Sequence, residues 1–108
     1  MIVTTTSSIA GSRTVRTLGL VRGNTIRARH IGRDITAALR TLVGGEISEY
    51  TKLFAEAREQ AIDRMVEEAG SLGADAVVDM RFSTSMVMTG AAELLAYGTA
   101  VQLEEETG

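Results

Sequence analysis

The residue types that could bind a metal ion are scarce in this chain. His30 is the single histidine, and cysteine is absent, so a thiolate site is excluded. Met86 and Met88 form a Met-x-Met pair that could bind Cu(I) together with His30. Methionines in or beside a strand more often fill a core or an interface, and His30 has no second histidine at ligand spacing. The acidic residues 104–106 could bind a hard ion, but such segments are usually solvated.

Side chains for catalysis are also sparse. No nucleophile–base pair is recognisable around the single imidazole. Asp75 and Asp79 fall at even spacing in an expected strand, so we expect them to share a face, where paired carboxylates could do acid–base work. Arg81 follows on that face, which favours an ordinary charge ladder. Tyr50 and Tyr97 could bind polar ligands, although amphipathic core edges explain them as well.

Arg58 lies where a charge is unexpected. It falls within the apolar arc of a long expected helix, and an arginine there is costly unless a carboxylate pairs with it. The favoured interpretation is a buried or interfacial salt bridge, and the alternative is an anion-binding arginine. The candidate partners are Asp34, Glu46, Asp79 and Glu93.

The pair Gly44-Gly45 does not form a phosphate-binding loop. It follows an expected helix, no Lys-Ser/Thr comes after it, and Glu46 would repel a phosphate. We expect Gly44 to cap one helix and Gly45 to turn the chain into the next.

The positions of the elements follow from the spacing of the hydrophobic residues, which alternate in strands and recur every three to four residues in helices. Strands are expected at residues 2–6, 15–23, 74–85 and 93–103, and helices at 32–43 and 48–72. Gly19 indicates a bulge, and Gly23-Asn24 a turn after which residues 25–29 can extend the ladder. Gly73 closes the long helix, 86–92 is a connection, and 104–108 is an acidic solvated tail.

The faces of these elements predict how they pack. The long helix has one wide apolar arc and an acidic opposite side. In 74–85, Val78 and Met80 should share one face, with Val77 on the other. In 93–103 one face carries almost no side-chain bulk, so a helix or another subunit must pack closely against it. That small face is formed by Ala96, Gly98 and Ala100.

The composition describes one domain, residues 1–103, with a lopsided charge. Residues 1–40 carry seven arginines and one acid, whereas residues 41–108 carry four basic and thirteen acidic residues. The basic part has no aromatic residue for base stacking, so we expect no nucleic-acid partner and favour complementary contacts within or between subunits. No signal peptide and no apolar run of the ~20 residues that cross a membrane are present, so we expect a soluble, cytoplasmic protein without a membrane partner.

Several segments together resemble the YbjQ-like family, a heavy-metal-binding family by description whose function is unknown. They are LGLVRG (18–23), RD (33–34), LVGGEISEYTKLFAEAREQA (42–61), LGADAVVDMRF (72–82) and YGTAV (97–101). The resemblance implies an α+β subunit of order ββααββ in a homopentamer, whose strands join an inter-subunit β-barrel ringed by helices. It makes the following residues structural or interface motif positions, without a catalytic role: Gly44, Gly45, Glu46, Tyr50, Arg58, Gly73, Ala74, Asp75, Tyr97, Gly98 and Thr99.

Three functional hypotheses stay open at this point. The favoured one is a non-enzymatic ring that binds a small ligand or a partner protein between its subunits. The second is a metal-binding ring, which would depend on His30, Met86 and Met88, so a metal ion is a possible cofactor. The third is an enzyme with a site shared between subunits, which would depend on Arg58, Tyr50 or Glu46.

Overall fold

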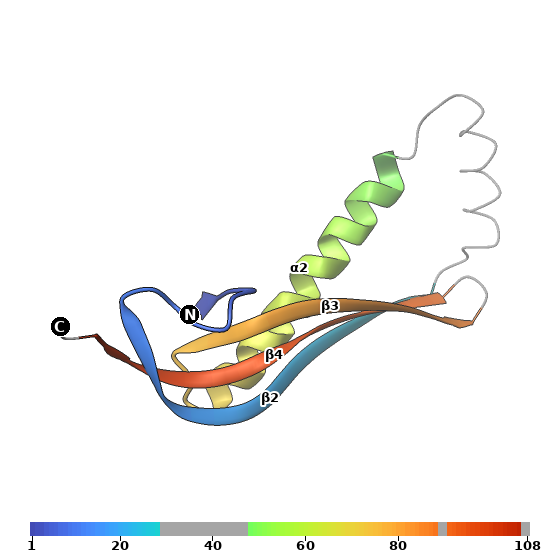
Figure 1. Ribbon diagram of the computed structural model, residues 1–108. Helices are drawn as coiled ribbons and strands as arrows, with labels where there is room; N and C mark the ends of the chain where they lie inside the picture. The colour runs from blue at the N-terminus through green and yellow to red at the C-terminus, as the bar shows by residue number, and fades with distance from the viewer. Residues whose placement is uncertain (29–47, 89–90, 107–108) are drawn as a thin grey trace.

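The computed structural model describes residues 1–28, 48–88 and 91–106. Its elements are β1 (Ile2–Val3), β2 (Ser12–Ala28), α2 (Ser48–Ser71), β3 (Ala76–Met88) and β4 (Ala91–Glu105). The strands form one four-stranded sheet in the order β1, β3, β4, β2, and α2 lies over one face of it (Figure 1). The α+β class is therefore confirmed. The expected helix 32–43 and the pair Gly44-Gly45 lie outside the described residues, so the order ββααββ stays a prediction.

β2 is one long strand, although the sequence predicted a turn within it. It pairs with β4 from Ser12 to Ala28 without a break at Gly23-Asn24. The predicted turn is wrong, because Gly23 is the position at which the strand contacts the backbone of α2. A Cβ at this position would collide with the carbonyl of Ala61 and the amide of Met65. A glycine therefore lets the backbone of α2 lie directly on the strand.

Bulges decide which strand residues face the helix. The predicted bulge at Gly19 is confirmed by a register shift after Thr17 and a φ of +123°. A second bulge lies at Asp79, whose φ is +54°, where β3 gains a residue relative to β4. Val77 and Met80 consequently both belong to the cluster under α2, and Val78 lies on the other side. The expected alternation in 74–85 is wrong for this reason.

The core lies between α2 and the sheet. Helix residues Ala57, Ala61, Met65 and Ala69 are fully buried, as are Ala96 and Ala100 of β4. The small face of the last strand is thus covered by the helix of the same chain, one of the two expected possibilities. The helix ends at Ser71, and Gly73, whose φ is +80°, closes it as predicted, while the Ala74 amide donates to the Ala69 carbonyl at 3.1 Å.

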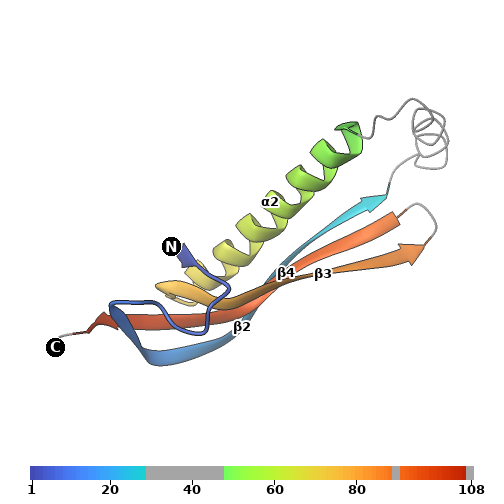
Figure 2. The same ribbon diagram turned by 45° about the horizontal axis from the view of Figure 1, so that its top comes forward.

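Among the residues that the structure describes, the opposite face of the sheet is covered only near one end. There Ile9 of the N-terminal segment packs on Ala76, Val78 and Val101. Elsewhere on this face Leu20 is 60% exposed and Ile26 is 56% exposed. Figure 2 shows the three long strands as a curved strip with α2 on one side. The molecule measures 59 × 24 × 16 Å, which is elongated for one domain.

The strand ends extend beyond their predicted limits. β3 continues to Met88 and β4 begins at Ala91, so most of the expected connection 86–92 belongs to strands. β4 also continues to Glu105, two residues into the expected tail. The Glu104 carboxylate pairs there with Arg13 at 2.8 Å, and both side chains are exposed. The N-terminal strand is shorter than 2–6, but backbone hydrogen bonds to β3 continue beyond it: the Thr4 amide donates to β3, and the carbonyls of Thr4 and Thr6 accept from β3.

Candidate functional site

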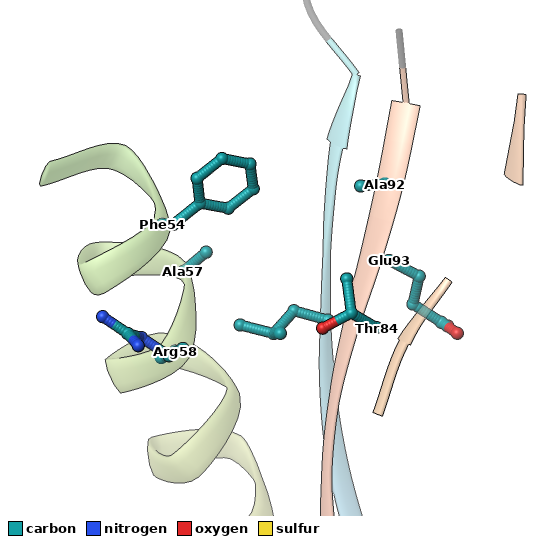
Figure 3. Close-up of a pocket in the computed structure, with 7 residues that line it drawn as sticks. Phe54, Ala57, Arg58, Thr84, Ala92 and Glu93 are labelled. Atoms are coloured by element: carbon teal, nitrogen blue, oxygen red, sulfur yellow. The ribbon is translucent and has the colours of Figure 1, made fainter. Parts of the chain in front are cut away.

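Arg58 lies at a cavity between α2 and the ends of β3 and β4. The cavity has a volume of about 350 Å³ and a mostly apolar lining. Figure 3 shows Phe54 and Arg58 on the helix side, with Glu93 turned away from the helix. The full lining is Phe54, Ala57, Arg58, Thr84, Ala92, Glu93 and Leu94.

The predicted buried salt bridge of Arg58 does not form within the described part of the chain. Arg58 is exposed, and neither Asp79 nor Glu93 forms an ion pair with it. Glu93 instead accepts a hydrogen bond from the Asn24 amide at 3.1 Å. The other two candidates, Asp34 and Glu46, lie outside the described residues. The position of Arg58 in the apolar arc predicted a buried side chain. Arg58 is exposed because α2 diverges from the sheet toward its N-terminal end (Figure 1).

Asp75 connects the end of the helix to the last strand. Its carboxylate oxygen Oδ2 accepts a hydrogen bond from the Leu103 amide at 2.8 Å, and its own amide donates to the Val101 carbonyl at 2.9 Å. Asp79 is the bulge residue, and its amide donates to the Thr6 carbonyl at 2.9 Å. The expected pairing of Asp75 and Asp79 on one strand face is wrong, since the bulge interrupts the alternation between them.

Gly98 of β4 lies opposite the bulge of β3, where the two paired strands approach closely. A Cβ on Gly98 would lie 2.6 Å from Cγ1 of Val77 and 3.0 Å from the Val78 carbonyl oxygen. Its neighbours Tyr97 and Thr99 are half-buried on the opposite face of the sheet. Tyr50 belongs to the first turn of α2, where the structure does not describe side chains.

A row of polar side chains crosses the face opposite α2, and sequence reasoning missed it. Tyr97 of β4 is paired directly with Arg22 of β2 on one side and with Arg81 of β3 on the other. Directly paired residues project from the same face of a sheet. Both arginines are exposed. The row could not be found from periodicity, because it depends on β4 lying between β2 and β3.

The residues described here do not fit a soft-metal site within one chain. No group of three His, Cys, Asp or Glu side chains suited to a metal ion occurs among them. Met86 is 78% exposed, and His30 lies outside the described residues. Met88 ends β3, where side chains are not described. With one histidine and no cysteine in the whole sequence, the donor set is poor for heavy metals.

The fold and its surfaces define a small α+β protein in which one long helix covers one face of a four-stranded sheet. A family model described as "Putative heavy-metal-binding" matches residues 1–104, and the chain belongs to this family, YbjQ. The family is uncharacterised, and no specific function is established for it.

Relatives and a solved structure agree with this membership. A UPF0145 protein of Methanosarcina acetivorans is 61% identical over 103 residues, covering 95% of this chain and 97% of the relative. A UPF0145 protein of Thermosipho africanus is 56% identical, with 97% of each chain covered. The crystal structure of a DUF74-family protein of unknown function from Pediococcus pentosaceus matches with a TM-score of 0.62 at 18% identity. It covers 96% of this chain and 98% of its own, and it supports the fold alone.

α2 does not combine the length and the apolar character that a membrane span requires.

Proposed function

We propose that this chain is the subunit of a cytoplasmic homo-oligomer, a pentamer, that binds a small ligand or a partner protein rather than catalysing a reaction. The observation that carries this proposal is the apolar surface left open on the face opposite α2, where Leu20 is 60% exposed and Ile26 is 56% exposed. Exposed apolar side chains on one broad face are typical of a surface that another chain covers.

The strand edges favour a second copy of this chain as the covering partner. The outer edge of β2 has no strand beside it, and β1 pairs with β3 only at Ala76 and Val77 among the described residues. Open strand edges invite pairing with another chain. If β2 of one copy pairs with β3 of the next, the sheet continues from subunit to subunit. The helices then lie outside, and the open faces turn toward a shared axis, as in an inter-subunit β-barrel.

The shape and the charge distribution support the same proposal. The radius of gyration is 17.8 Å, whereas a compact domain of this length has a value of about 13 Å. The basic first part and acidic remainder of the chain also provide complementary surfaces for contacts between copies. Neither feature favours a metal-binding function, and the donor set argues against it.

Native mass spectrometry on protein purified without added metal or chelator tests this proposal. We expect assemblies of the pentamer mass without bound metal. Leu20→Lys, which places a charge on the open face, should shift the population toward monomer. Glu59→Lys, a charge change at an exposed position of α2, is the control and should leave the assembly intact. A monomeric wild-type protein would refute the oligomer, and a stoichiometric metal mass would favour the metal-binding alternative.

A further inference from the structure

The cross-strand row Arg22–Tyr97–Arg81 presents positive charge that no acid of the described residues pairs with. We propose that this row is an anion site that binds the phosphate groups of a small phosphorylated molecule. The proposal deepens the small-ligand function proposed above, since it names the chemical class of the ligand.

Arg22 is the least constrained member of the row. It is exposed, and no hydrogen bond, ion pair or ring contact holds its guanidinium in the described structure. Across the strand pair it faces Tyr97, whose hydroxyl also has no hydrogen-bond partner there. A guanidinium fork and a phenol hydroxyl are both donors suited to phosphate oxygens.

Arg81 is held in place by backbone carbonyls instead of a carboxylate. Its Nη1 donates to the Thr5 carbonyl at 2.9 Å and to the Met80 carbonyl at 2.8 Å. A guanidinium has five N–H donors, so those on Nε and Nη2 remain for a ligand. Because carbonyl oxygens carry no net charge, the positive charge of Arg81 is retained.

The neighbouring acids do not neutralise the row. The ion pair that forms in the described structure, Arg13 with Glu104, involves neither arginine of the row. Glu93, the acid of β4 nearest to Tyr97 on the same face, lies four residues before it and accepts a hydrogen bond from Asn24. The bulge residue Asp79 forms no ion pair with Arg81.

The geometry favours a ligand with more than one negative charge. Neighbouring strands lie about 4.8 Å apart, so the backbones of Arg22 and Arg81 are separated by roughly 10 Å with Tyr97 between them. Two long guanidinium side chains can approach one phosphate group above the tyrosine or bind two linked groups. In the proposed oligomer these rows would surround the shared axis, where repulsion between arginines makes a bound polyanion more favourable still.

Titration calorimetry with inorganic phosphate and with pyrophosphate, at constant ionic strength, tests the proposal on the full chain. The test variant is Arg22→Gln, because the Arg22 side chain makes no hydrogen bond or ion pair in the described part of the chain that the substitution would remove. The control is Arg16→Gln. Arg16 is an exposed arginine of the same strand, but its pair Gln102 bonds to Gly73 at the end of α2, so Arg16 projects from the helix side. Both variants remove one charge from β2.

We expect Arg22→Gln to weaken binding of the tighter ligand by roughly tenfold to a hundredfold, with little change in Arg16→Gln. Tighter binding of pyrophosphate would indicate that the arginines bind separate phosphate groups, and equal binding would indicate one shared group. Equal losses in both variants, or no binding by the wild-type protein, would overturn the proposal. Native mass spectrometry of the wild-type protein and of Arg22→Gln separates the anion site from the oligomer. A wild-type pentamer that binds no phosphate would contradict the anion site alone, and an Arg22→Gln pentamer would show that its weaker binding does not come from lost assembly.

Discussion

Gly23 is the residue whose replacement should affect the fold most directly. In Gly23→Ala the new methyl group meets the backbone of α2 at Ala61 and Met65, and backbone atoms yield less easily than the end of a side chain. The helix must move off β2, so we expect the free energy of unfolding to fall by about 1–3 kcal/mol or more. Chemical denaturation monitored by circular dichroism at a fixed protein concentration measures the change.

Gly70→Ala is the matched control for this substitution. Gly70 lies in α2, and a Cβ there would have no atom within 4 Å apart from the adjacent residues and backbone of its own helix. Alanine is the better helix former by about 1 kcal/mol, so Gly70→Ala should stabilise the protein. Equal stability of the two alanine variants would contradict the close contact between α2 and β2.

Arg58 and Tyr97 illustrate the limits of sequence reasoning for single residues. The helical period placed Arg58 within the apolar arc of the helix, and Arg58 lines a cavity together with Phe54 and Ala57 of α2. It could not predict exposure, because burial depends on where α2 leaves the sheet. For Tyr97 the strand period gave the correct face, but its neighbours Arg22 and Arg81 come from strand pairing over long distances in the sequence.

The elements themselves were more predictable than their connections. The long helix and the last strand lie within two residues of their predicted limits, because each has a long, regular hydrophobic period. The turn at Gly23-Asn24 was wrong, since a glycine in a strand can mark either a turn or a close approach. The bulge at Asp79 gave no sequence signal, because a non-glycine residue there has a positive φ.

Asp75 supports the junction between the helix end and β4. In Asp75→Ala the Leu103 amide loses the carboxylate that accepts its hydrogen bond, and we expect a loss of about 1–2 kcal/mol in unfolding free energy. Asp63→Ala is the control, since Asp63 is an exposed acid of α2. Both variants remove one negative charge. A similar stability of the two proteins by urea denaturation would show that the bond at Asp75 contributes nothing.

The elongated subunit should depend on assembly for its thermal stability. If the open sheet face is covered only in the oligomer, folding and association are linked, and the unfolding temperature must rise with protein concentration. Thermal unfolding followed by circular dichroism over a roughly hundredfold concentration range measures this dependence. Leu20→Lys should have a lower unfolding temperature that depends less on protein concentration. A wild-type unfolding temperature independent of concentration would indicate that the single chain is stable alone.

The strand order also has a consequence for synthesis on the ribosome. β2 is translated early, yet its neighbour in the sheet, β4, is the last strand to emerge. At ~5–20 residues per second, β2 waits roughly several seconds for that neighbour. α2 is translated in between, and its contact at Gly23 offers β2 an early cover. We therefore expect the helix to shield the nascent strand from other unfinished chains until the sheet can form.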